Sequence, residues 1–193
     1  MIDQLKSAIC KTVKQFQEHP LDFLSESDIQ AVLFVELRNA TSDLRYPFDA
    51  EGKNHRFGFT DPFCIHPVTT EYHVSEGKFD IAVLSKEPDP KSDIWRQPCR
   101  VAIEIKLWQP CEREPKYIMD VKKLQRYQEK MQTAGQKFTG IAMLFVHPYK
   151  TGVPKDIIEE ISPDAYPENG VALHLVTDKV HWWKQCPGPS ITE

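Results

Sequence analysis

The sequence lacks any apolar run of the roughly 18 residues that a membrane-spanning helix requires. Its first six residues, Met1 to Lys6, also lack the basic segment followed by an apolar segment that marks an export signal. We therefore expect a cytoplasmic protein that makes no contact with a membrane.

Cysteines are few, odd in number and scattered. The chain has 5 of them, with no C-x-x-C pair, so reduced thiols are expected in a protein that is not exported. A structural zinc site needs clustered Cys and His ligands. The one close pair is Cys64 and His66, and this argues against such a site.

An excess of positive charge is also lacking. The chain carries 24 basic and 28 acidic side chains, a formal net charge of −4. This balance argues against a broad surface that coats nucleic acid, but it leaves room for a local basic groove around an acidic centre. The 193 residues show no internal repeat and no linker, so we expect a single domain over residues 1–193.

Two helices are predicted near the N-terminus. Apolar residues recur at steps of three and four over residues 2–18, and His19-Pro20 ends this helix. A second helix starts near Ser25 and fades near Asn39. Ser25 and Asp28 resemble a capping box, with Asp in place of Glu or Gln.

The remainder alternates between strands, loops and helices. Residues 40–62 have few periodic apolar positions, which indicates a long irregular segment. Strands are expected at 64–74, 79–84, 100–108, 139–147, 171–177 and 180–184, and helices at 117–134 and 154–162. A turn at 75–78 would make the first two strands a hairpin, 86–98 would be a polar loop, and Asp178-Lys179 a tight turn. This order predicts an α/β (α+β) protein with a mixed sheet flanked by helices.

The strand at 100–108 carries charge where a central strand should be apolar. Side chains alternate between the two faces of a strand, so Val101, Ile103 and Ile105 share one face. Glu104 and Lys106 project together from the other face, about 6.6 Å apart along the strand. Charged groups seldom occupy such positions unless they are paired or liganded.

The preceding strand repeats the anomaly at Asp80. Strict alternation would put Phe79, Ile81 and Val83 on one face and Asp80, Ala82 and Leu84 on the other. If the two strands pair, the Asp80 and Glu104 carboxylates converge, and a shared Mg²⁺ or Mn²⁺ would relieve their repulsion. Lys106 would add a fixed positive charge beside the ion. The alternative is a buried Glu104–Lys106 ion pair, with Asp80 merely ending a turn.

Asp80, then 23 residues, then Glu104-Ile105-Lys106 resembles the signature of the PD-(D/E)xK nuclease superfamily, although Phe79 stands where proline precedes the first acid. The resemblance implies a restriction endonuclease-like αβββαβ core over about 25–147, with the N-terminal helix 2–18 and a C-terminal αββ extension over 154–184. It also implies that Asp80, Glu104 and the Ile105 carbonyl bind the metal, and that Lys106 is the catalytic lysine.

Members of that superfamily often carry a further acid on the first core helix. Glu26, at the start of the second predicted helix, resembles it and is our first choice. Acids at a helix N-terminus also favour the helix dipole, which is the structural explanation. Glu36 and Glu71 are the rivals.

Lys122, Arg126 and Lys130 recur at four-residue steps in the predicted helix 117–134. A polyanionic partner would explain this positive stripe. The alternative is a solvated face relieved by Glu129 and Asp120. Trp182-Trp183 in the last strand would pack in the core or against a partner, with base stacking as the weaker option.

The resemblance thus favours a metal-dependent nuclease, with DNA as the expected substrate. An RNA-directed nuclease is a variant that the sequence does not separate. The alternative from another class is a catalytically inactive nuclease-fold module for nucleic-acid binding or complex assembly. A homodimer would suit cutting of both strands, because two active sites need a two-fold relation.

Overall fold

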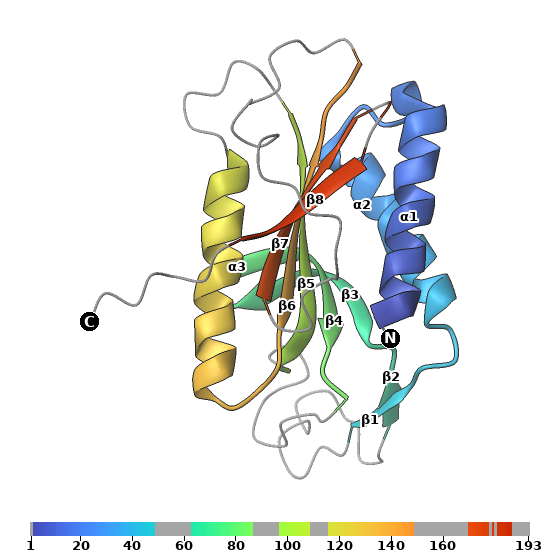
Figure 1. The fold of residues 1–193 in the computed structure, drawn as a ribbon. Helices are drawn as coiled ribbons and strands as arrows, with labels where there is room; N and C mark the ends of the chain where they lie inside the picture. The colour runs from blue at the N-terminus through green and yellow to red at the C-terminus, as the bar shows by residue number, and fades with distance from the viewer. Residues whose placement is uncertain are drawn as a thin grey trace, which may run out of the picture.

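The computed structural model describes residues 2–48, 63–86, 97–108, 116–148, 170–177, 179 and 181–186. In this part three α-helices flank a six-stranded mixed sheet, which confirms the predicted α/β class (Figure 1). The helices are α1 (Ile2–Glu18), α2 (Glu26–Ala40) and α3 (Lys116–Thr133), with a short 3-10 helix η1 (Pro20–Asp22) between the first two. The strands of the large sheet are β3 (Val68–Val74), β4 (Gly77–Leu84), β5 (Cys99–Leu107), β6 (Thr139–Phe145), β7 (Gly170–Val176) and β8 (His181–Cys186).

The large sheet runs in the order β3-β4-β5-β6-β7-β8, so neighbours in the sheet follow each other in the chain. β5, β6 and β7 are parallel, and β3, β4 and β8 add antiparallel pairings at the two ends. Parallel strands are buried on both faces because helices cover their crossovers. Every residue of β6 and β7 is buried accordingly.

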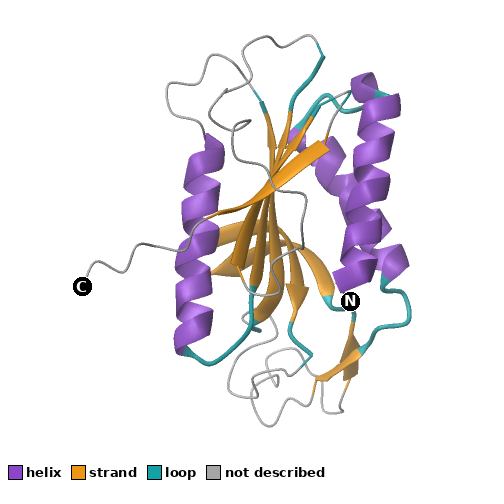
Figure 2. Ribbon diagram, in the orientation of Figure 1, coloured by secondary structure: helices purple, strands orange, loops and turns teal. Residues whose placement is uncertain are grey.

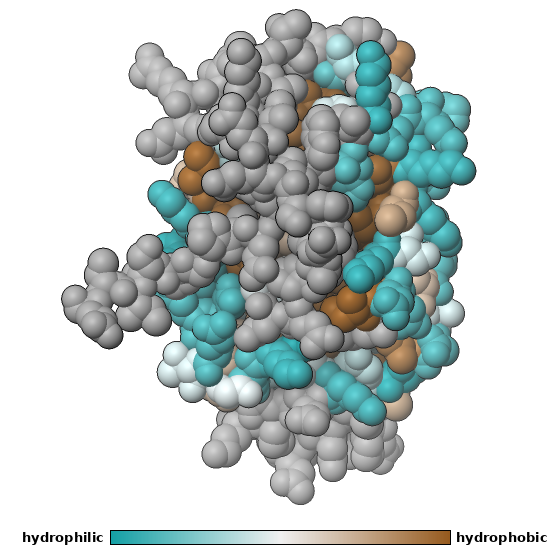
Figure 3. Space-filling view, in the orientation of Figure 1, coloured by the Kyte–Doolittle hydropathy of each residue, from teal (hydrophilic) through white to brown (hydrophobic). Residues whose placement is uncertain are grey.

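Helices cover both faces of this sheet, α1 and α2 on one side and α3 on the other (Figure 2). Val101, Ile103 and Ile105 of β5 belong to the core cluster formed with α1 and α2. Ala102 belongs to the second cluster, formed with α3. The alternation predicted for β5 is therefore confirmed. On the outside, the described side chains over α1 are mainly hydrophilic in Figure 3.

Both N-terminal helices form as the sequence predicts. The apolar face of α1 is buried, with Phe16 ring-stacked edge-on against Phe145 of β6 at 5.0 Å between centroids. Ser25 caps α2, and both hydrogen bonds of the capping box with Asp28 are present. This box fixes Glu26 at the first position of α2.

The strand predicted over 64–74 is wrong in one respect, because it is two strands. β2 (Phe63–Ile65) pairs with β1 (Tyr46–Phe48) in a separate two-stranded sheet, and β3 starts only at Val68. Pro67 lies between them and has no N–H to donate to a ladder. β1 also lies inside 40–62, which was predicted to be irregular.

Several predictions fall outside the described residues. They are the helix 154–162, most of the loop 86–98, residues 49–62, Asp178 of the predicted turn, and the side chains of Trp182 and Trp183. In the described part of the chain, no helix is long and apolar enough to cross a membrane.

The predicted alternation of β4 is wrong at Phe79. Ile81 and Val83 face α1 and α2, but Phe79 faces α3, where its ring meets Tyr127 edge-on at 5.2 Å between centroids. On β3, Glu71 adopts a φ of 54°, and the register contains no pair between Glu71 and Asp80. Left-handed backbone at a non-glycine residue is uncommon and breaks a regular strand. The alternation of side chains between the two faces of the sheet is therefore interrupted at the same level in both strands, at Glu71 of β3 and at Asp80 of β4.

Gly140 of β6 marks the closest approach of α3 to the sheet. A Cβ there would lie 3.1 Å from Leu124 Cβ and 3.1 Å from Val171 Cγ2. We predict that Gly140→Ala lowers the free energy of unfolding by about 1–3 kcal/mol, because overpacking forces neighbours to shift. Urea unfolding measures this. Adding Val171→Ala, which removes one of the three close contacts, should make the losses less than additive, and strict additivity would contradict the packing argument.

Candidate active site

The predicted site residues of the sheet meet where β4 and β5 separate. The ladder between these strands includes Ile81↔Ile103 and stops before Asp80 and Glu104. Beyond it the Asp80 carboxylate accepts a hydrogen bond from the Ile105 amide, with 2.7 Å between Oδ2 and N. The side chain of Asp80 thus replaces the backbone partner that β4 no longer provides. We call this place the β4–β5 fork.

The main chain of Asp80 is held from the other side. Gln30 of α2 donates to the Asp80 carbonyl at 2.7 Å and to Glu71 Oε1 at 2.9 Å from the same side-chain nitrogen. Glu71 in turn pairs with Lys78. Glu71 and Asp80 are not paired in the β3–β4 ladder. Gln30 links these two residues instead.

Glu104 is the most deeply buried acid of the site, with 2% of its side chain exposed. Lys123 of α3 is its partner, at 2.7 Å between Nζ and Oε1. Burial and the charge of Asp80 raise the pKa of Glu104 to about 8, against the lowering effect of Lys123. Glu104 therefore pairs with α3, and the alternative of a Glu104–Lys106 ion pair is wrong.

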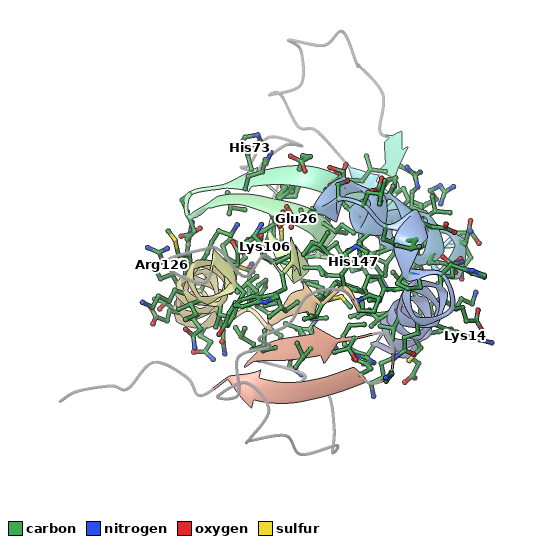
Figure 4. All side chains as sticks on the ribbon, turned by 90° about the horizontal axis from the view of Figure 1, so that it is seen from above. Lys14, Glu26, His73, Lys106, Arg126 and His147 are labelled. Carbon is green, nitrogen blue, oxygen red and sulfur yellow. The ribbon has the colours of Figure 1, made fainter. Side chains whose placement is uncertain are left out.

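Lys106 lies near the end of β5, between the first turn of α2 and Asp120 in the second turn of α3. Its Nζ is 3.1 Å from Glu26 Oε2 and 3.6 Å from Asp120 Oδ2. Glu26 also accepts from the Leu107 amide at 3.3 Å, and Figure 4 shows Glu26 and Lys106 side by side. Burial opposes the charge on Lys106, but the carboxylates of Asp120, Glu26 and Asp80 raise its pKa above the ordinary value. Lys106 is therefore an ammonium ion at neutral pH.

The rival acids lie in different places. Glu36 forms an ion pair with Lys11 of α1, at 3.2 Å between Nζ and Oε2. Glu71 lies next to Asp80 through Gln30, as described above. Of the three candidates, Glu26 alone contacts Lys106 among the described residues.

Charge in this cluster is not balanced. Four carboxylates (Glu26, Asp80, Glu104 and Asp120) face two ammonium groups (Lys106 and Lys123). With all six ionised, four minus two leaves two negative charges. Burial raises the pKa of Asp80 and of Asp120 as well as that of Glu104. All three shifts indicate a site that is short of positive charge.

Sequence reasoning missed three residues of the cluster. Asp120 was named only as an acid that would relieve a solvated face, in the alternative interpretation of the basic stripe. Lys123 and Gln30 were given no role in the site. A signal for the first two was present, because Asp120, Lys123 and Tyr127 are spaced i, i+3 and i+7 and so share a face with the buried Leu124. Nothing in the sequence distinguishes Gln30 from other polar residues of its helix.

The predicted basic stripe lies on the outer side of α3, where Lys122, Arg126 and Lys130 are all exposed. Figure 4 shows Arg126 there, pointing away from the sheet. Lys122 and Arg126 line a surface hollow that also reaches Asp120 and Lys123 of the site. Lys130 is engaged by the β3–β4 turn, at 2.6 Å from Ser75 Oγ. The stripe and the fork are therefore parts of one continuous surface.

Metal sites built from three or more His, Cys, Asp or Glu side chains do not occur among the described residues. His66 has partners at both ring nitrogens, the Val68 amide at 3.1 Å and the Thr41 hydroxyl at 3.5 Å. Comparisons of the chain with protein-family models, curated proteins and solved structures found no match.

The raised pKa of Glu104 predicts how stability depends on pH. Between its ordinary value of 4.5 and about 8, the folded protein keeps a proton that the unfolded chain releases. The stabilisation is complete below the lower value and is lost as pH rises through the upper one, by up to a few kcal/mol. We expect urea unfolding in EDTA to show falling stability from pH 5 to 8.

Glu104→Gln should flatten that slope, while Glu36→Gln, at a carboxylate outside the cluster, should leave it as it is. A Glu104→Gln protein with the full slope would show that Glu104 does not titrate in this range.

Proposed function

We propose that the protein is a metal-dependent nuclease of the PD-(D/E)xK type, and that the β4–β5 fork is its active site. The observation that carries the proposal is that two carboxyl groups lie where the two strands part: Asp80, and a buried Glu104 whose pKa burial and the charge of Asp80 raise to about 8. Two adjacent carboxyl groups in a buried place are costly unless a cation is shared between them.

The element order supports the finer assignment of the fold. Apart from the short strands β1 and β2, which lie between α2 and β3, the elements α2, β3, β4, β5, α3 and β6 follow one another along the chain. This is the αβββαβ order of the restriction endonuclease-like core. Asp80 lies on its second strand and Glu104 on its third. α1 precedes this core, while β7 and β8 follow it as part of the expected C-terminal extension.

The residues at the fork fit a divalent ion with oxygen ligands. Asp80 and Glu104 would hold it, with the carbonyl of Ile105, whose amide already points to Asp80. N–H and C=O of one residue in a strand point toward the same neighbour, so this carbonyl opens into the fork. The two uncompensated negative charges match one Mg²⁺ or Mn²⁺. Such an ion would activate water and neutralise charge that builds on a phosphate.

Lys106 would act as a cation rather than as a base, because the neighbouring carboxylates keep it protonated. An ammonium group there can hold the attacking water or a phosphoryl oxygen as negative charge develops. Glu26 and Asp120 would be positioning residues, since both hold Lys106 at the end of β5. Glu26 would also fix the strand end through the Leu107 amide.

DNA is the substrate that we favour. The hollow beside the fork is lined by three cations, Lys122, Lys123 and Arg126, and by three acids, Glu76, Asp120 and Glu129. The cations suit phosphate contacts. RNA is distinguished by digesting both polymers side by side. A homodimer would place two forks in a two-fold relation and suit cutting of both strands.

The second candidate function is an inactive module that binds nucleic acid or assembles a complex. It is favoured by the contact between Lys123 and Glu104 at 2.7 Å, because a lysine can replace a metal ion as the counter-ion of a buried acid. In such a protein Asp80 and Glu104 would bind no divalent cation.

Cleavage of supercoiled and linear DNA with Mn²⁺ tests the proposal. Lys106→Met should lower the rate by about 10² or more, as the loss of one transition-state donor does in other enzymes. Lys14→Met is the matched control, because Lys14 is an exposed lysine of α1 that pairs only with Glu18 among described residues. Equal activity of both variants would contradict the role of Lys106.

Calorimetry separates the two functions in the same preparation. The nuclease should bind Mn²⁺ and release protons near pH 7, because the ion displaces the proton of Glu104, and Asp80→Asn should lose this binding. A wild-type protein that binds no Mn²⁺, with or without DNA, favours the inactive module.

Salt dependence of DNA binding tests the stripe. Lys122→Gln and Arg126→Gln should each weaken binding and reduce the slope of log K against log salt by about one unit. Lys130→Gln should change it less, because its ammonium is already held by Ser75 and Glu76. The measurement is fluorescence anisotropy in EDTA over a salt series. Equal slopes for all three variants and the wild type would show that the basic stripe makes no contact with DNA.

A further inference from the structure

A second polar pocket lies at the opposite end of β5 from the fork. It forms where β4 and α3 end and β5 begins. Figure 1 shows these ends of the three elements at the lower end of the view. Its volume is about 390 Å³, the liquid volume of roughly 13 water molecules. The strand rise of about 3.3 Å per residue puts its Arg100 some 13 Å from Glu104 along β5.

Cations from three elements line this pocket. Lys86 follows β4, Arg100 lies in β5 and Lys137 follows α3, with Ser85 and Gln136 beside them. None of the lining residues is acidic. In the described part of the chain no carboxylate forms an ion pair with Lys86, Arg100 or Lys137.

An irregularity in the backbone of β5 directs the side chain of Arg100 toward this pocket. Val83 pairs with Val101 but Leu84 pairs with Cys99, so Arg100 is the extra residue of a β-bulge. Bulges redirect a side chain and are frequent beside functional sites. One guanidinium nitrogen of Arg100, Nη1, is buried and has no hydrogen-bond partner among the residues that the structure describes. A buried donor without a partner is costly, and a ligand oxygen would satisfy it.

Helix capping does not explain these cations. Basic residues often bond the last carbonyls of a helix, but those of α3 are occupied by its own backbone. The carbonyls of Lys130, Met131 and Gln132 accept hydrogen bonds from the amides of Ala134, Gln136 and Gly135 at 3.1, 2.8 and 2.9 Å. The positive charge of the pocket is therefore left for another anion.

We propose that this pocket binds a phosphate group, with Arg100 as its principal ligand and Lys86 and Lys137 supplying charge around it. Arg favours phosphate because its planar fork donates two parallel hydrogen bonds. The phosphate is either that of a free nucleotide-sized molecule or that of a nucleic-acid strand. The proposal does not depend on cleavage at the fork.

Titration of the metal-free protein with inorganic phosphate, followed by NMR of the backbone amides, tests it. Saturable shifts are expected at Ser85, Gln136 and Lys137. Arg100→Gln should weaken the affinity about tenfold or more, as the loss of a charge-assisted bond does, and Lys137→Gln should weaken it by a smaller factor. Lys14→Gln makes the same change in net charge on α1 and should leave the affinity unchanged.

Lys86→Gln and Lys137→Gln change exposed side chains, so they test the pocket even if Arg100→Gln does not fold. Adenosine monophosphate and a short oligonucleotide with and without a 5′-phosphate identify the source of the group. A loss in the pocket variants for either ligand supports the site. Absence of saturable binding by all three probes, or equal affinity in wild type and pocket variants, overturns it, whatever the cleavage assay shows.

Discussion

The hydrogen bond from the Ile105 amide to the Asp80 carboxylate, 2.7 Å long, allows β4 and β5 to part inside a buried sheet. Without it, the separation would leave an amide of a central strand without a partner, and such a group costs about 1–3 kcal/mol when buried. Gln30 does the same for the Asp80 carbonyl on the other side of β4. At the fork the two strands are thus not paired through their backbones, but side chains supply the missing hydrogen bonds. Two carboxyl groups can therefore lie at one place.

Electrostatics at the fork follow from this geometry. Asp80 and Glu104 are close enough for the charge of Asp80 to raise the pKa of Glu104, and burial prevents water from screening the effect. Lys123 relieves it directly through its ion pair with Glu104, and both Lys123 and Lys106 also contact Asp120. Among the described residues, the loss of Lys123 would leave the buried Glu104 without an ion pair, whereas the loss of Lys106 would leave Asp120 paired with Lys123.

Alternation in β5 could be predicted from the sequence because all charged residues of the strand fall on one face of an otherwise apolar segment. This leaves a single register that buries its isoleucines. The same rule failed at Phe79, because the left-handed backbone of Glu71 lies on the neighbouring strand and leaves no mark near Phe79 in the sequence. Glu26 could be placed by resemblance and by its cap, whereas Lys123 could not be separated from its neighbours Lys122 and Arg126 by composition. Its burial depends on how α3 packs over the β3–β4 hairpin.

The two lysines of the fork differ in the lengths of their contacts, and this difference indicates different roles for them. Lys123 Nζ makes two contacts of 2.7 Å, one to a main-chain carbonyl at Lys78 and one to Glu104. Lys106 makes longer contacts of 3.1 and 3.6 Å, and its nearer partner, Glu26, is 44% exposed. A cation with long bonds and a half-exposed partner can move toward an incoming phosphate at small cost. Lys123 cannot do so without breaking the ion pair that compensates Glu104. Lys123 therefore stabilises the site, and Lys106 is the lysine that the proposed reaction would use.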